Sequence, residues 1–305
     1  MSRRRKKGRD ISGVLLFDKP HGMSSNQALQ RVRHLFNARK AGHTGSLDPL
    51  ATGLLPICLG EATKYSSYLL DSDKHYDTIA CLGARSTTGD SEGERIDERP
   101  VPEFSEQEVS HVLEQFLGKG EQVPPMYSAL RQDGRRLYEL ARKGVEVERP
   151  PRKIRIDRLA LTEQERDRLH LSVSCSKGTY IRSLVEDIGE ALGCGAFVGM
   201  LRRTGVSPYI HPEMWTLEAL ASKAAEGLDS LDACLIPVDT ALSGFPLLKL
   251  DENQSFDICH GRPAAVDEMP EGDLFRLYDP QNRFLGLGTP AENHQIRPKR
   301  LISNG

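Results

Sequence analysis

The sequence predicts an α+β protein in which a large mixed domain is followed by a small β domain. Two observations support this. Up to about residue 245, apolar residues that alternate as in strands are interleaved with apolar residues that recur at helical spacing. From about Pro246, short strand-like segments separated by turns replace that pattern. We therefore expect domains over residues 11–245 and 246–305, preceded by a disordered basic tail at residues 1–10.

The elements of the large domain can be assigned in order. A strand at 13–17 is followed by a helix that we expect Ser25 to cap, because Ala28, Leu29 and Val32 follow at helical spacing. The further expected elements are helices at 61–70, 105–117 and 217–225, a helix that begins at Thr179, and strands at 74–83, 154–161 and 169–175. Paired prolines enclose a basic segment at about 124–151, which we interpret as an insertion.

The small domain should be all β. Its expected strands are 247–250, 274–278 and 284–288, with a turn at Asp279–Asn282 before the last of them. A unit of this size has room for a small β-barrel-like fold. The basic residues near its end, Arg297, Lys299 and Arg300, either contact nucleic acid or remain solvated.

Composition narrows the function classes. The chain has 305 residues, of which 38% are hydrophobic and 28% charged, as in ordinary soluble proteins. No apolar run approaches the roughly 18 residues of a membrane span, and the short run after the basic N-terminus does not predict export. Six scattered cysteines without a Cys-x-x-Cys pair favour neither a zinc site nor disulfides, so we expect a cytoplasmic protein. The net charge of -2 excludes a uniformly basic nucleic-acid binder but not local basic stripes.

The most informative segment runs from Gly42 to Gly53, with the sequence GHTGSLDPLATG. Three glycines and a proline exclude a regular helix or a central strand. The segment therefore reads as a shaped loop with a single carboxylate, Asp48, followed by the apolar run at 54–59. A simpler alternative is that Asp48 caps a helix whose first residue is Pro49.

This segment resembles the active-site motif of the tRNA pseudouridine-55 (TruB-type) synthase family. Four more segments resemble motifs of the same family, and together they span most of residues 12–210. They are KPHGMSS, which begins at Lys19 and Pro20; the Lys-x-Tyr pattern at Lys74–Tyr76; GTYIR at 178–182; and FVGMLRRT at 197–204.

The resemblance implies a central, largely antiparallel sheet with flanking helices and a C-terminal PUA-type domain. It implies that Asp48 is the essential nucleophile and that Arg182 pairs with it. It also implies that Tyr76 stacks on the target base, that Tyr180 and Leu201 line the uracil pocket, and that Lys19 and Pro20 pack beneath the catalytic loop. The insertion at 124–151 would be the thumb that closes over RNA.

Ordinary structural roles compete with these assignments. Tyr76 is also a typical half-buried strand residue, Leu201 a typical core residue, and Lys19-Pro20 a plain turn. His43 either stabilises its turn or fills the space that a flipped nucleotide leaves. Arg182 is different, because a cation at a helix start is electrostatically unfavourable unless it faces a carboxylate.

The reaction that the resemblance implies needs no cofactor and no metal. Asp48 should be ionised at neutral pH and can act directly as a nucleophile. The residues do not distinguish addition to C6, attack at C1′ or initial elimination of the base, and Tyr76 is a candidate acceptor or relay for the C5 proton. The target base must be flipped out and stacked on aromatic rings.

The expected partner is tRNA, through its TΨC stem-loop. We expect a monomer without an obligate protein partner and without a membrane. A guide-RNA-dependent pseudouridine synthase subunit and a tRNA-folding chaperone are the alternatives.

Overall fold

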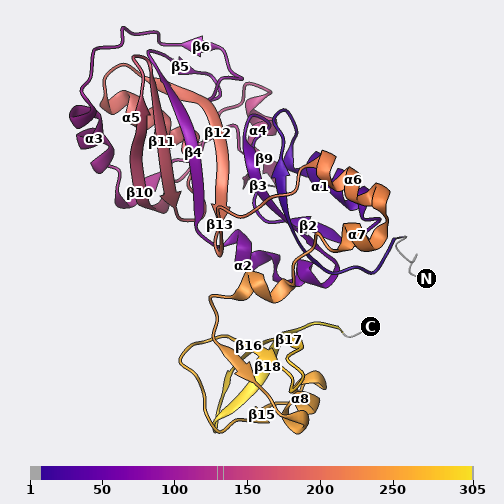
Figure 1. Ribbon diagram of the computed structural model, residues 1–305. Helices are drawn as coiled ribbons and strands as arrows, with labels where there is room; N and C mark the ends of the chain where they lie inside the picture. Colours follow the sequence, from indigo (N-terminus) through magenta and orange to yellow (C-terminus); the bar gives the residue numbers. More distant parts are fainter. Residues whose placement is uncertain (1–7, 129, 133, 304–305) are drawn as a thin grey trace.

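The computed structural model describes residues 8–128, 130–132 and 134–303. Its larger part is built on a nine-stranded sheet, shown in Figure 1. The strands are β1 (Gly13–Lys19), β2 (Ala41–His43), β3 (Thr52–Leu59), β4 (Lys74–Leu82), β7 (Gly118–Gln122), β10 (Arg152–Gln164), β11 (Arg168–Cys175), β12 (Ala196–Val206) and β13 (Tyr209–Ile210).

The strand order is β1-β3-β12-β4-β11-β10-β7, with β2 paired to β3 and β13 paired to β12. Every pairing is antiparallel except that of β3 with β12. The prediction of an α+β fold with a mixed, largely antiparallel central sheet is therefore confirmed. The parallel contact joins only two residue pairs, Arg202 with Thr52 and Arg203 with Gly53.

Helices flank the nine-stranded sheet (Figure 1). They are α1 (Ser25–Leu35), α2 (Ser66–Leu70), α3 (Glu106–Glu114), α4 (Leu137–Ala141), α5 (Ile181–Ala191), α6 (Leu217–Glu226) and α7 (Leu228–Asp232), with 3-10 helices η1 (Gly60–Tyr65) and η2 (Val238–Leu242). Short strand pairs lie outside the sheet: β5 (Arg85–Ser86) with β6 (Arg95–Ile96), and β8 (Arg131–Gln132) with β9 (Arg135–Arg136). None of the described helices has the length and apolar character needed to cross a membrane.

The sheet is buried on both faces around β1, which explains its continuous apolar run. Leu15 and Phe17 belong to the main core beneath the helices. Val14 and Leu16 point to the opposite face and pack in a second core that includes Tyr65 of η1.

The small domain contains β14 (Leu247–Lys249), α8 (Glu252–Cys259), β15 (Ala264–Ala265), β16 (Phe275–Tyr278), β17 (Phe284–Ala291) and β18 (Gln295–Leu301). Its strands form one sheet in the order β14-β16-β17-β18-β15. The expected small β domain is present, but it is not all β. We missed α8, although Asp251 caps it through Gln254 in a regular capping box.

Contacts join the small domain to η1. The Tyr65 hydroxyl donates to the Arg300 carbonyl at 2.9 Å, and Lys64 Nζ donates to the Leu301 carbonyl at 3.0 Å. The rings of Tyr65 and Phe284 lie 5.9 Å apart. The last strand of the chain is therefore fixed against the segment that leads from β3 toward β4.

Two further expectations need correction. Ser24, not Ser25, caps α1, in a capping box with Gln27. The disordered tail expected at residues 1–10 falls mainly on residues 1–7, which lie outside the described residues. At residues 8–10 the chain has fixed contacts, because Arg9 pairs with Asp232 and its backbone bonds to Asn37 and Arg39.

Candidate active site

The loop that carries Asp48 connects β2 to β3. Its apolar residues Leu47, Leu50 and Ala51 are buried, whereas 42% of the Asp48 side-chain surface is exposed. No helix follows Asp48, since residues 48–51 lead directly into β3. The alternative that Asp48 caps a helix is therefore wrong, and its carboxylate is free for another role.

Two residues near the N-terminus fasten this loop. Ser25 Oγ accepts from the Leu47 amide at 2.7 Å and donates to the Leu47 carbonyl at 3.0 Å. The fully buried Lys19 donates through Nζ to the carbonyls of Pro20 (3.0 Å), Met23 (2.6 Å) and Pro49 (3.3 Å). These bonds hold the residues on both sides of Asp48. Burial lowers the pKa of Lys19 to about 8.

Glycine is required where the loop enters β3. Gly53 has φ of +94°, and a Cβ atom there would lie 2.3 Å from the Arg203 carbonyl oxygen. This close approach brings the loop next to β12 at the parallel contact.

Arg182 reaches Asp48 from α5, the helix that precedes β12 in the chain. It is the second residue of α5, its side chain is 5% exposed, and its Nη2 lies 2.9 Å from Asp48 Oδ2. Its Nη1 donates to the Thr88 carbonyl at 2.8 Å, and Nη2 donates to the Tyr127 carbonyl at 2.6 Å. The structure therefore places the predicted partner of Asp48 in an ion pair with it.

A second carboxylate, Asp90, lies near Arg182 and was not among the site residues expected from the sequence. Asp90 is 3% exposed, and its Oδ2 lies 3.8 Å from Arg182 Nε. Its Oδ1 accepts from Thr88 Oγ1 at 2.6 Å and from the Glu92 amide at 3.1 Å. The Thr-x-Asp spacing of 88–90 signals a side-chain turn, but nothing in the sequence identifies Arg182 as its neighbour.

The electrostatics of Asp48 reflect these neighbours. Desolvation by the surrounding protein raises the pKa of Asp48, the charge of Arg182 acts to lower it, and the charge of Asp90 raises it further. The balance lies above the ordinary value for an aspartate. Asp48 therefore becomes a stronger base and nucleophile once it is ionised.

The two candidate aromatic residues come from different elements. Tyr76 lies on β4 opposite Arg203 of β12, and Tyr180 immediately precedes α5. Burial raises the pKa of both phenols, and the charge of Asp48 contributes in the same direction to each. Both hydroxyl groups therefore lie within the electrostatic reach of Asp48 and remain protonated at neutral pH.

His43 and Leu201 complete the candidate set. His43 ends β2, and its buried Nδ1 has no hydrogen-bond partner among the described residues. Burial lowers the pKa of His43, and the charge of Arg203 acts in the same direction, so the ring is neutral at pH 7. Leu201 is 7% exposed and lies on β12 directly before the two residues that contact β3.

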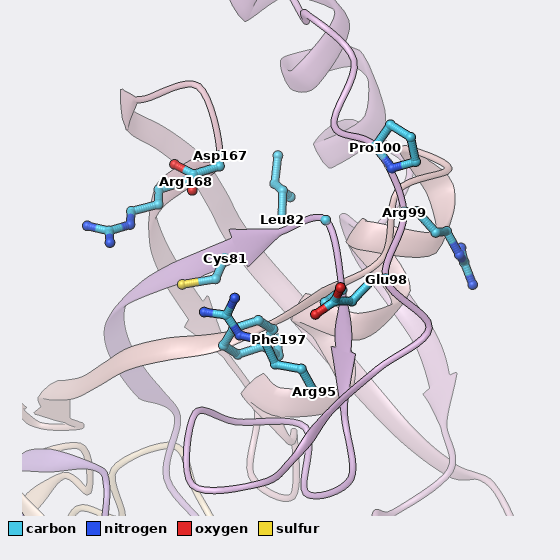
Figure 2. A pocket seen from close by; sticks show the side chains of 11 residues that line it. Cys81, Leu82, Arg95, Glu98, Arg99, Pro100, Asp167, Arg168 and Phe197 are labelled. Atoms are coloured by element: carbon cyan, nitrogen blue, oxygen red, sulfur yellow. The ribbon is translucent and has the colours of Figure 1, made fainter.

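The cavity in Figure 2 lies away from these residues. It has a volume of about 450 Å³ and is lined by Cys81, Arg95, Glu98, Phe197 and their neighbours, at the end of β4 remote from Tyr76. At the same end lie Glu163, Glu165 and His170, the described group whose spacing suits a metal ion. No candidate catalytic residue belongs to either set.

Comparisons with known proteins agree on one family. Residues 33–181 match the family described as "TruB family pseudouridylate synthase (N terminal domain)". Residues 182–243 match "tRNA pseudouridylate synthase B C-terminal domain", and residues 246–302 match "Pseudouridine synthase II TruB, C-terminal".

Individual relatives extend over nearly the whole chain. The proteins named tRNA pseudouridine synthase B from Stutzerimonas stutzeri (strain A1501) and Pseudomonas syringae pv. syringae (strain B728a) are each 53% identical over 295 residues, which cover 96% of both chains. Among solved structures, a chain of a "Cbf5-Nop10-Gar1 Complex" superposes with a TM-score of 0.72 at 24% identity. The match covers 96% of this chain and 84% of that one. At this identity the likeness concerns the fold alone.

Proposed function

The chain belongs to the TruB family of pseudouridylate synthases, and we propose that it converts uridine 55 in the TΨC loop of tRNA to pseudouridine. The observation that carries this proposal is the Asp48–Arg182 ion pair, at 2.9 Å, in the loop whose sequence resembles the family's catalytic motif. The names of its relatives, tRNA pseudouridine synthase B, support tRNA as the substrate.

The reaction is an isomerisation. The N1–C1′ bond of uridine breaks, a C5–C1′ bond forms, the proton on C5 leaves and N1 takes up a proton, so the composition does not change. The reaction needs no oxidant, metal or cosubstrate. Asp48 is the nucleophile, and the buried Arg182 holds its carboxylate in place through one oxygen.

The surrounding residues receive the flipped base. Tyr76 stacks on the uracil and relays the proton that leaves C5, while Tyr180 and Leu201 form the walls of the base site. Stacking returns about 1–3 kcal/mol per base, which offsets part of the cost of unstacking. The neutral, partly exposed His43 fills the space that the nucleotide leaves.

Lys19 and Pro20 support this site from beneath rather than acting on the substrate. The Lys19 ammonium donates to the carbonyls of Pro20 and Pro49, and Pro49 directly follows the nucleophile Asp48. The insertion at 124–151 also reaches the site, because the Tyr127 carbonyl accepts from Arg182. This contact supports the interpretation of the insertion as a thumb whose base is part of the active site.

We propose that the protein acts on tRNA alone, as a monomer in the cytoplasm, and that the small domain is a PUA-type RNA-binding unit. We also propose a role as a tRNA-folding chaperone, which needs binding of tRNA but not the reaction of Asp48. The guide-RNA-dependent alternative has less support, because the relatives that are 53% identical over 96% of this chain are named tRNA pseudouridine synthase B.

The test is tritium release from tRNA labelled at C5 of its uridines, with the purified wild type and Asp48→Asn in parallel. Pseudouridine is mapped in the product by carbodiimide-dependent stops of reverse transcription. We expect release with the wild type only and a single stop in the TΨC loop. A folded wild type that binds tRNA without release would refute the proposal.

A further inference from the structure

Arg203 is the largest fully buried side chain among the described residues, with 1% of its surface exposed. It lies on β12 opposite Tyr76 of β4 on one side and Gly53 of β3 on the other. The preceding residue, Arg202, is different: it is 36% exposed and forms two bonds with the Asp18 carboxylate, at 3.0 and 2.7 Å. The two adjacent arginines thus have separate roles.

The guanidinium of Arg203 contacts both ends of the catalytic loop. Its Nε donates to the Leu54 carbonyl at 2.7 Å, and its Nη2 donates to the Gly45 carbonyl at 3.2 Å. Gly45 precedes Asp48 in the loop, and Leu54 follows it. A single cation therefore fixes the loop on both sides of Asp48.

No carboxylate of the described residues forms an ion pair with Arg203, in contrast to Arg182 and Arg202. A buried cation without a counterion is costly, and a leucine or methionine would fill this core position without that cost. The compensation comes from the two loop carbonyls.

Tyr76 lies directly opposite Arg203 in the pairing of β4 with β12, so the two side chains emerge on the same face of the sheet. Burial raises the pKa of Tyr76, whereas the charge of Arg203 acts in the opposite direction. The buried cation is therefore a neighbour of the phenol as well as of the catalytic loop.

We propose that Arg203 is a positioning residue for the isomerisation. It fixes the loop that carries Asp48 next to the strand that carries Tyr76, so that the carboxylate and the phenol keep one relative position. This inference rests on the proposed function, in which Asp48 attacks and Tyr76 relays the C5 proton. It adds the residue that sets the distance and orientation between these two groups.

The test compares Arg203→Lys, Tyr76→Phe and the double variant with the wild type, and uses Arg202→Lys as the matched control on the same strand. We expect Arg203→Lys to lower the single-turnover rate constant about 10- to 100-fold with little change in the Kd for tRNA. The double variant should be slower than Tyr76→Phe, because the loop contacts of Arg203 are still lost, but by less than the full loss caused by Arg203→Lys alone, because part of that loss acts through Tyr76. Arg202→Lys should stay close to the wild type. Independent, multiplicative losses in the double variant would overturn the proposal.

A spectroscopic measurement separates positioning from general damage to the fold. With ¹³Cζ-labelled tyrosine, Arg203→Lys should shift the Tyr76 resonance and leave the other tyrosines in place; an unchanged Tyr76 resonance would overturn the proposal. If Arg203→Lys does not fold, Tyr76→Phe replaces it, and the ¹⁵N guanidinium resonances of Arg203 should shift. The contact can thus be tested even if the wild type fails to modify tRNA, an outcome that would refute the proposed function separately.

Discussion

Asp90→Asn tests how the second carboxylate acts on the Asp48–Arg182 ion pair, because it removes a charge and preserves the shape. The asparagine oxygen can still accept from Thr88 and Glu92, as Asp90 Oδ1 does at 2.6 and 3.1 Å. The amide nitrogen would replace Oδ2 and face the Arg182 Nε–H group, which is also a donor. The variant therefore weakens one side of the Arg182 cage.

The size of the effect follows from the geometry. At the observed 3.8 Å, two opposite charges attract by about 4 kcal/mol at an effective dielectric constant of about 20. Desolvation of the carboxylate offsets a large part of this attraction, so we expect a net loss of about 1–3 kcal/mol in the free energy of unfolding. A shift in Arg182 would misplace Asp48 and lower the rate about 10- to 100-fold.

The pH dependence has a defined sign. The charge of Asp90 contributes to the raised pKa of Asp48, so its removal should lower that pKa. Since ionised Asp48 is the proposed nucleophile, the rate should fall as the pH decreases through this pKa. The acidic limb of the rate profile should therefore move to lower pH in Asp90→Asn.

The assay is single-turnover pseudouridine formation across the acidic range, together with urea denaturation. Glu92→Gln is the matched control, because it removes a charge from an exposed side chain of the same loop. A limb that moves to higher pH, or a rate and stability equal to those of the wild type, would show that Asp90 does not act through Arg182.

Three further predictions follow from the site. Asp48→Asn should abolish pseudouridine formation and retain tRNA binding. It should also leave the Tm equal or higher, because a carboxylate with a raised pKa destabilises the fold when it is ionised. A clear drop in Tm would contradict this reasoning. Gly53→Ala should lower the free energy of unfolding by at least about 2 kcal/mol, whereas Gly22→Ala, at a positive φ with nothing within 4 Å, should cost less; equal losses in urea denaturation would contradict the steric argument. The pKa of Lys19 is lowered to about 8 in the folded protein, so the folded state loses the Lys19 proton at a lower pH than the unfolded state does. The free energy of unfolding of the wild type relative to Lys19→Met should therefore rise by roughly 3 kcal/mol between pH 7.5 and 10.5. A difference that stays constant with pH would contradict this assignment.

The sequence predicted the meeting of Asp48 and Arg182 because both lie in long motifs, and the structure brings them together. It did not predict Asp90, since an acidic residue in a polar loop is usually solvated and only the tertiary structure reveals the cation beside it. Arg202 and Arg203 are adjacent in one motif, and nothing in the sequence distinguishes their environments. On a strand, however, adjacent side chains point to opposite faces, and only one of the two is buried.

Misplaced elements have similarly local causes. Ser24 and Ser25 are both good helix caps, and the choice between them depends on the distant Leu47, which bonds to Ser25. The edge strand β7 was missed because Gly118 and Gly120 weaken its strand pattern. In both cases partners far along the chain decide between local options of similar energy.

The narrow contact between β3 and β12 has a consequence for the order of folding. Asp48 lies in the loop that directly precedes β3, and Arg182 lies in α5, which directly precedes β12. The strands β4, β10 and β11 lie between these two residues in the chain. Such a distant pairing costs loop entropy and forms slowly. During refolding, helical and strand signals should therefore recover before pseudouridine formation does. Catalytic competence would mark the closure of the sheet, so a partly folded chain would carry the native elements without the active site.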